Sequence, residues 1–189
     1  MTNHERLLAM LAERSARRGQ FTLASGRTSS LYIDARLTTM SPDGLALIGP
    51  LALDAIRDAG WRADAVGGLT LGADPISYAI AYASALEAPR QGELVRAFTV
   101  RKEAKQHGTG RLIEGPFRTG DRVVVIEDVI TTGGSALRAV EAVRAAGGEV
   151  LGVLALVDRE EGGRDALEGA GLAVRSLALA SDIVPLLPG

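Results

Sequence analysis

The stretch VVVIEDVITTGGSA at residues 123–136 constrains the fold of this chain more than any other segment. It begins with a run of apolar residues, reaches the adjacent carboxylates Glu127 and Asp128, and continues into small and hydroxyl residues. An unbroken β-branched run is typical of a strand buried on both faces, as in parallel sheets. We expect this strand to span residues 123–126. Because such sheets bind ligands just beyond the carboxyl ends of their strands, the acidic pair predicts a binding site.

The residues after the acidic pair indicate a phosphate-binding loop. Leu137, Val140 and Val143 recur at helical spacing, so a helix is expected to begin near Ser135. Its free N–H groups and the positive end of its dipole favour a bound phosphate. Two glycines allow the backbone to approach a ligand closely, and three hydroxyl groups add donors. The loop consists of Thr131, Thr132, Gly133, Gly134 and Ser135. It has neither the lysine of a Walker loop nor GxGxxG spacing.

Length and composition exclude several classes of protein. A chain of 189 residues with 47% hydrophobic residues fits one α/β domain with a sizeable core. With no cysteine and two histidines, thiolate and histidine metal clusters are excluded, and any metal should be a hard, oxygen-bound ion such as Mg²⁺. The net charge of −2 argues against a general nucleic-acid binder. The N-terminus does not fit a signal peptide and no apolar run approaches a membrane span, so we expect a cytoplasmic protein.

Alternating strand and helix patterns predict a mostly parallel, doubly wound α/β sheet. Thr2 and Glu5 have capping-box spacing for a first helix that ends near Gly19, and a β-hairpin is expected over residues 21–36. The core strands are expected at residues 65–69, 94–100, 123–126 and 150–157 and near Val174. The later helices are expected to begin at Ser41, at Asp74 as an N-cap, near Ser135 and near Arg164, and the second of these to end near Leu86.

Both lysines of the chain, Lys102 and Lys105, lie in one segment, RKEAKQHGTGR, at residues 101–111. The other nineteen of the 21 lysine and arginine residues are arginine. A compact ammonium differs from a guanidinium in reach, hydration and pKa, so a site for a crowded oxyanion can require lysine. Gly108 and Gly110 favour a segment that moves as a lid.

The central stretch resembles the phosphoribosyl pyrophosphate signature of the type I phosphoribosyltransferases. Three further segments are similar to those of orotate phosphoribosyltransferases, namely FTLASGRTSSLYID at residues 21–34, RKEAKQHGTG followed by LIEG at 101–115, and VDREEGG at 157–163. The resemblance covers most of the chain from 21 to 163. It implies a single phosphoribosyltransferase domain, 1–189, with residues 1–40 as an N-terminal hood over the substrate and 41–189 as the α/β core.

The resemblance also implies an activity. Ribose 5-phosphate would pass from phosphoribosyl pyrophosphate to orotate, giving orotidine 5′-monophosphate and pyrophosphate in pyrimidine (UMP) synthesis. Mg²⁺ would be held mainly by substrate, with Glu127 and Asp128 nearby and no firm protein ligand. The family forms a homodimer, in which the loop 101–111 completes the neighbouring site, and membranes and nucleic acids are not expected partners.

The same resemblance assigns roles to individual residues. The expected catalytic residues are Lys105, His107 and Asp128. Donor contacts are expected from Arg101, Lys102, Lys105, His107, Glu127, Asp128, Val129, Ile130, Thr131, Thr132, Gly133, Gly134 and Ser135. Orotate contacts are expected from Tyr32, Ile33, Thr131 and Arg159. Two positions depart from the family, since Ala24 and Gly72 stand where many members have a lysine that helps to hold pyrophosphate.

Two other functions stay open at this point. A purine phosphoribosyltransferase would share the fold and the donor, but a purine has no carboxylate to match Arg159. A regulator that senses phosphoribosyl pyrophosphate without chemistry would be expected to have a strongly basic surface or a nucleic-acid module, and the sequence indicates neither.

Overall fold

The computed structural model describes residues 1–22, 28–91, 94–103 and 112–187 of the chain. Its main feature is a six-stranded sheet with the order β5-β4-β3-β6-β7-β8. Neighbouring strands are parallel except β4 and β5, which are antiparallel. The strands are β3 (Ala65–Leu69), β4 (Arg96–Val100), β5 (Ile113–Glu114), β6 (Arg122–Ile130), β7 (Glu149–Asp158) and β8 (Val174–Leu179). The prediction of a mostly parallel α/β sheet is confirmed.

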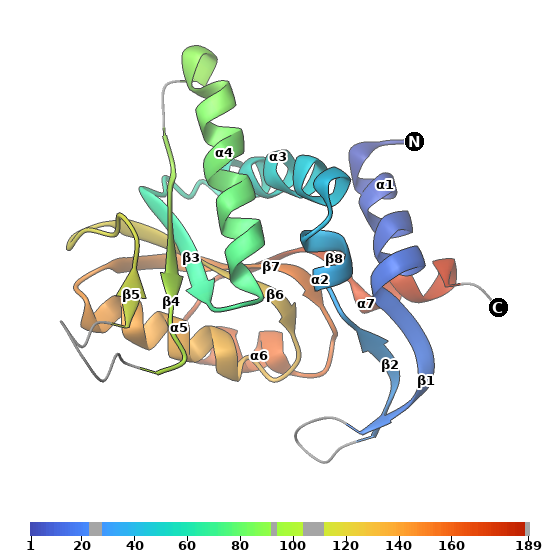
Figure 1. The fold of residues 1–189 in the computed structure, drawn as a ribbon. Helices are drawn as coiled ribbons and strands as arrows, with labels where there is room; N and C mark the ends of the chain where they lie inside the picture. Colours follow the sequence, from blue (N-terminus) through green and yellow to red (C-terminus); the bar gives the residue numbers. More distant parts are fainter. Residues whose placement is uncertain (23–27, 92–93, 104–111, 188–189) are drawn as a thin grey trace.

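Helices cover both faces of this sheet, with α3 and α4 on one face and α5 and α6 on the other (Figure 1). The α-helices of the described ranges are α1 (Asn3–Met10), α2 (Arg36–Thr39), α3 (Pro42–Asp58), α4 (Ala73–Gln91), α5 (Gly134–Ala145), α6 (Gly163–Gly169) and α7 (Ala180–Ile183). A π-helix, η1 (Leu11–Ser15), continues α1, and a 3-10 helix, η2 (Val184–Leu186), follows α7. Among these described helices, none combines the length and apolarity that a membrane span requires.

The apolar run of β6 supplies side chains to both layers of the core. Val124 and Ile126 pack in the layer of α3 and α4, whereas Val123 and Val125 pack in the layer of α5 and α6. All four side chains are fully buried. The absence of polar alternation in this strand therefore reflects coverage on both faces, as the sequence predicted.

A second, two-stranded sheet extends from one end of the core (Figure 1). Its strands, β1 (Ala16–Thr22) and β2 (Thr28–Ile33), pair antiparallel and confirm the predicted hairpin, whose connection lies outside the described residues. The first helix was expected to end near Gly19, and this boundary was wrong. The helical segment ends at Ser15, because Ala16 already pairs with Ile33 across the hairpin. The division into a hood and a core stays a prediction.

Two helix starts follow their local signals and a third does not. Thr2 and Glu5 form the predicted capping box, and the Ser41 side chain accepts a hydrogen bond from the backbone N–H of Gly44. The predicted N-cap at Asp74 was wrong. Helix α4 begins at Ala73, so Asp74 lies in its first turn, and the helix continues past Leu86 to Gln91. The buried carboxylate of Asp74 instead accepts hydrogen bonds from the hydroxyls of Thr70 and Thr99, which join it to the loop after β3 and to β4.

Gly67 and Gly68 permit the close pairing of the central strands. A Cβ at Gly67 would overlap the carbonyl oxygen of Phe98 in β4, and one at Gly68 would overlap the carbonyl oxygen of Ile126 in β6. Backbone atoms cannot give way as a flexible side chain can. Glycine in the interior of this strand therefore marks a close approach of backbones rather than a turn.

We expect Gly68→Ala to lower the free energy of unfolding by about 1–3 kcal/mol, because the added methyl group overpacks β3 against β6. Chemical denaturation measures this change. The matched control is Gly169→Ala at the end of α6, where an added Cβ would meet no atom within 4 Å. Equal stability of the two variants would contradict the close-approach interpretation.

Candidate active site

The two neighbours of β6 leave it at different points along the strand. Pairing with β3 stops at Val125, opposite Gly67, whereas pairing with β7 continues to Ile130. The strand was expected to stop at Ile126, and that boundary was wrong, because β7 carries it through the acidic pair. One edge of β6 is therefore open beside Glu127 and Asp128, while the other edge holds their backbone in place.

A cavity of about 320 Å³ lies beside this open edge. Its walls come from β2 and the residues after it, the end of β3 and the loop after it, the segment after β4, the end of β6 and the first turns of α5. The lining residues are Tyr32, Ile33, Asp34, Ala35, Arg36, Leu69, Thr70, Leu71, Gly72, Lys102, Glu127, Asp128, Val129, Ser135 and Arg138. The predicted site residues among them are Tyr32, Ile33, Lys102, Glu127, Asp128, Val129 and Ser135.

A larger cavity, of about 450 Å³, lies between β5 and the C-terminal part of α5. It is lined by Leu112, Ile113, Gly115, Phe117, Thr119, Ala142, Ala145 and Ala146. Among the described residues, no charged side chain lines this cavity. The smaller cavity at the strand ends is the candidate site, since a few convergent polar groups, and not volume alone, mark a site of chemistry.

The adjacent carboxyl groups of the site have different surroundings. Glu127 is 9% exposed, and its Oε2 is buried with no hydrogen-bond partner in the described ranges. Burial, followed by the charge of Asp128 and a hydrogen bond with it, raises the pKa of Glu127 to about 9. Asp128 is half-buried, and its Oδ1 accepts a hydrogen bond of 3.0 Å from the backbone N–H of Val129. Glu127 therefore keeps its proton at neutral pH in the free protein.

Gly72 lets the carboxylate of Asp128 lie against the loop after β3. A Cβ at this position would overlap the Asp128 carboxylate. Any side chain here, including the lysine noted for many family members, would require Asp128 to move. The glycine that replaces the family's lysine at position 72 thus leaves the space that the Asp128 carboxylate occupies.

Of the predicted phosphate loop, residues 131–133 connect β6 to α5, whereas Gly134 and Ser135 already belong to the helix, and Gly133 is the N-cap with a φ of 80°. A Cβ at Gly133 would lie 2.9 Å from the carbonyl oxygen of Gly163, and one at Gly163 would overlap the carbonyl oxygen of Thr131. Gly133 is therefore required by its left-handed backbone and by the packing of two loops, and not only by a ligand. Ser135, in the first turn of α5, lines the cavity. The predicted donor residues that do not line it are Arg101, Ile130, Thr131, Thr132, Gly133 and Gly134.

Arg101 and Lys102 follow β4 but differ in their contacts. The Arg101 guanidinium lies 3.7 Å from the carboxylate of Glu114 on β5, and the Arg101 backbone N–H donates to Leu112. Arg101 is thus engaged away from the cavity, whereas Lys102 lines it. The predicted catalytic residues Lys105 and His107 lie outside the described residues.

Arg159 lies at the end of β7 and reaches the hairpin. Its side chain is 4% exposed, and Nη2 donates to the Leu31 carbonyl of β2 at 2.7 Å and to Glu161 Oε1 at 2.6 Å. Its backbone N–H donates to the carbonyl of Ile130 in β6. Arg159 does not line the cavity, but it joins β7 to the strand whose next residues, Tyr32 and Ile33, do.

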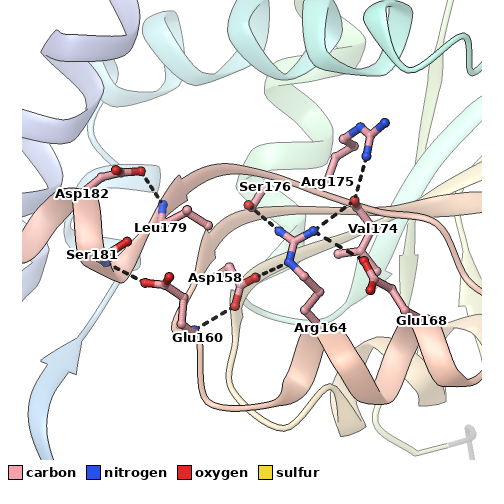
Figure 2. A network of polar contacts seen from close by, with 10 residues as sticks. All are labelled: Asp158, Glu160, Arg164, Glu168, Val174, Arg175, Ser176, Leu179, Ser181 and Asp182. Atoms are coloured by element: carbon pink, nitrogen blue, oxygen red, sulfur yellow. Dashed lines mark hydrogen bonds and ion pairs between the residues drawn. The ribbon is translucent and has the colours of Figure 1, made fainter.

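Asp158 organises the loop that carries Arg159 (Figure 2). This buried carboxylate accepts hydrogen bonds from the backbone N–H of Glu160 at 2.9 Å and from Nε of Arg164 at 2.8 Å. Arg164 also donates to the hydroxyl of Ser176 on β8, and Glu160 accepts from the backbone N–H of Ser181. The backbone on both sides of Arg159 is therefore fixed to neighbouring elements.

Three charged residues of the cavity were not among the residues predicted from the sequence. Asp34 and Arg36 form a two-point ion pair at 2.8 and 3.0 Å, which holds the pKa of Asp34 below its ordinary value, and Arg36 lies within the electrostatic reach of Asp128. Arg138 follows Ser135 by three residues and so shares its face of α5. That spacing was a usable signal for Arg138. The position of Arg36 depends on how the hairpin packs against the core, and no local sequence pattern predicts that packing.

Known proteins resemble this chain over nearly its whole length. The family model described as "Phosphoribosyl transferase domain" matches residues 39–170. The orotate phosphoribosyltransferase of Aquifex aeolicus is 44% identical over 187 residues, which cover 97% of this chain and 99% of that protein. A crystal structure of Mycobacterium tuberculosis orotate phosphoribosyltransferase with Fe(III) dicitrate has a TM-score of 0.82 at 44% identity, covering 96% of this chain and 99% of that one. The same enzyme in complex with 5-phospho-α-D-ribosyl 1-diphosphate has a TM-score of 0.78 at 41% identity, covering 97% and 99%.

This chain belongs to the orotate phosphoribosyltransferase family. The predicted resemblance and the type I phosphoribosyltransferase fold are thereby confirmed. Members of this family are transferases, so the regulator without chemistry loses its support.

The oxygen ligands of the site suit a hard cation that a substrate helps to hold. In the described part of the chain, no group of three or more acidic, histidine or cysteine side chains is arranged to hold a metal ion. Glu127 and Asp128 supply two adjacent carboxyl groups, one with an unsatisfied buried oxygen. Mg²⁺ is usually bound by one or two carboxylates together with substrate phosphates and water. The residues present therefore fit Mg²⁺ that arrives with a phosphorylated substrate.

The raised pKa of Glu127 predicts a pH dependence of stability in the free protein. The folded chain keeps a proton that the unfolded chain loses above about pH 4.5, so the stabilisation from this group is complete below that pH and declines as the pH rises to about 9. We expect Glu127→Gln to flatten this decline, with the melting temperature measured from pH 4.5 to 9 without ligands. Glu141→Gln, an exposed site on α5, is the control. Parallel curves for wild type and Glu127→Gln would contradict the assignment.

Proposed function

We propose that this chain catalyses the Mg²⁺-dependent transfer of ribose 5-phosphate from phosphoribosyl pyrophosphate to orotate, giving orotidine 5′-monophosphate and pyrophosphate in UMP synthesis. The observation that carries the proposal is one cavity at the strand ends lined by Glu127, Asp128, Ser135 and Lys102, with Arg159 buried behind the hairpin strand. Relatives of similar length that are named orotate phosphoribosyltransferase support the same activity. A cytoplasmic location stays a prediction of the sequence.

In this proposal the donor lies along the open edge of β6. Its 5′-phosphate binds at the loop of residues 131–135, where the N-terminus of α5 offers backbone N–H groups and a favourable dipole. The ribose hydroxyls bind at Glu127 and Asp128, since carboxyl groups pair well with hydroxyl donors. The pyrophosphate faces Lys102, with Arg101, Lys105 and His107 completing its surroundings when the predicted loop 101–111 closes.

The acceptor lies between the hairpin and the end of β7. Tyr32 and Ile33 line the cavity on the hairpin side. Arg159 supplies the cation for the carboxylate of orotate. Thr131, which lies in the phosphate loop, completes the acceptor contacts. A buried guanidinium is a strong partner for a carboxylate, because the charge-assisted bond forms away from water.

The transfer forms the bond between N1 of orotate and C1 of the ribose as the bond from C1 to the pyrophosphate oxygen breaks. The N1 proton is lost to water, and the sugar gains cationic character while the leaving group gains negative charge. Asp128 stabilises the sugar, and Lys102, Lys105 and His107 stabilise the departing pyrophosphate, so catalysis is mainly positional and electrostatic. Bound Mg²⁺, near Glu127 and Asp128, would neutralise part of the pyrophosphate charge.

The acceptor assignment is tested with Arg159→Gln, which keeps a donor for the Leu31 carbonyl but removes the charge. We expect the KM for orotate to rise at least about tenfold, because one charge-assisted hydrogen bond is worth about 1.5–3 kcal/mol, while the KM for phosphoribosyl pyrophosphate changes little. Loss of orotate absorbance measures the rate.

Arg175→Gln, at an exposed position on β8, is the control for the loss of an arginine. Equal changes in both KM values would remove the assignment of Arg159 to the acceptor. Product assays of wild type with adenine and hypoxanthine test the purine alternative directly, and turnover of either base in place of orotate would establish it.

We also propose that two copies form a homodimer with shared sites. Helix α4 carries a row of large exposed side chains at four-residue spacing, with Tyr78 52%, Tyr82 67% and Leu86 64% exposed. An apolar and aromatic row of this kind on one helix face suits a two-fold contact with the same row of another copy. Helix α4 packs beside β4, which ends at Val100 directly before the predicted loop 101–111. Contact through α4 would bring that loop near the partner's site.

Shared sites are tested by mixing two inactive variants, Asp128→Asn and Lys105→Ala. When equal amounts are unfolded together and refolded, random pairing gives about half mixed dimers, and one of the two sites in each has both residues intact. Activity should recover to about one quarter of wild type. Each variant refolded alone is the control, and a mixture that recovers nothing would show that the loop serves its own chain.

A further inference from the structure

Arg159 already has a carboxylate partner within its own chain. Its Nη2 group has two hydrogens, and the contacts at 2.7 Å to the Leu31 carbonyl and 2.6 Å to Glu161 Oε1 take both. The Arg159 side chain is 4% exposed and that of Glu161 22%, so the pair forms largely away from water. A ligand carboxylate that binds through this nitrogen must therefore displace one of the two partners.

The loop geometry brings Glu161, and not its neighbour Glu160, onto Arg159. Glu160 has a left-handed backbone, with a φ of 58°, and its N–H donates to Asp158. The side chain of Glu160 turns toward α7, where it accepts a hydrogen bond of 2.7 Å from the backbone N–H of Ser181 (Figure 2). The reversal at Glu160 returns the chain toward Arg159 at the next residue. The position of Glu161 is thus a product of the network around Asp158.

The two partners of Arg159 differ in how readily they can leave. The Leu31 carbonyl belongs to β2, which is paired with β1 opposite Arg18, and it cannot move without breaking the hairpin. Glu161 lies on a loop with its side chain 22% exposed, and within the described ranges its one ion pair is with Arg159. A change of rotamer would carry its carboxylate into water. Glu161 is therefore the partner that a ligand can replace.

We propose that Glu161 occupies the position of the acceptor's carboxylate on Arg159 while the site is empty, and is displaced into solvent when the acceptor binds. This inference rests on the proposed function, in which Arg159 binds orotate. A buried guanidinium charge without a carboxylate beside it would be costly, and Glu161 supplies that carboxylate between turnovers. The carboxylates of Glu161 and of the acceptor then compete for one cation, and the affinity for the acceptor depends on how much more strongly its carboxylate binds Arg159 than Glu161 does. Glu161 therefore weakens acceptor binding.

The test is Glu161→Gln, which keeps the shape of the side chain and a hydrogen-bond acceptor but removes the competing charge. We expect the KM for orotate to fall about threefold to tenfold, with the KM for phosphoribosyl pyrophosphate unchanged. Uracil, which has the same ring without the carboxylate, should gain no affinity in equilibrium binding. Glu160→Gln is the matched control, since it removes one negative charge from the same loop on the side that faces Ser181.

A second arm places Glu161→Gln in the Arg159→Gln background, where we expect no gain in orotate affinity because the cation for which the carboxylates compete is gone. An unchanged or raised KM for orotate in the single variant would overturn the inference, as would an equal gain in the Glu160→Gln control. These outcomes require a wild type that converts orotate. A wild type that does not would overturn the proposed function itself.

Discussion

The site depends on the unequal pairing of one strand. Strand β6 is held on both sides only as far as Val125, and then by β7 alone up to Ile130. The side held by β7 fixes the backbone of the acidic pair, while the side vacated by β3 leaves room for a ligand. A strand paired equally on both sides would bury Glu127 and Asp128 in the sheet, and a loop would leave them unconstrained. The cavity is therefore a consequence of strand length within the sheet.

The cavity combines two adjacent carboxyl groups, the buried Glu127 and its neighbour Asp128, with nearby cations. Glu127 is held protonated in the free protein by its burial and by the neighbouring Asp128, and one of its oxygens has no partner in the described chain. The surrounding cations, Arg36, Lys102 and Arg138, come from three different segments. A substrate with several phosphate charges and sugar hydroxyls would meet both kinds of group. This mixture explains how one small cavity can suit a ligand that is both anionic and rich in hydroxyls.

Two loops from neighbouring strands are locked together at the edge of the site. Gly133 and Gly163 bring the loops after β6 and β7 into backbone contact, and Asp158 ties the second loop to Arg164 and Glu160. Arg159 extends from this joined structure to the Leu31 carbonyl of the hairpin. Packing and hydrogen bonds thus join the loop after β6, the loop after β7 and the hairpin strand β2. A displacement of either loop would displace the other, because Gly133 and Gly163 bring the two backbones into contact.

The sequence by itself determined the sheet class, the buried strand of residues 123–126, the hairpin and the acidic pair, because each rests on a local pattern of burial, capping or turn residues. It also determined that Lys102 and Glu127 are candidates, through residue type and spacing. It did not determine where strands end. The pairing of Ala16 with Ile33 cut the first helix short, and β7 extended β6 through Glu127 and Asp128. Nor did it determine that Arg36 and Arg138 meet at one cavity or that Glu161 pairs with Arg159. Only the tertiary structure decided these features, because they depend on the register and packing of segments that are distant along the chain, and no local pattern records such distances.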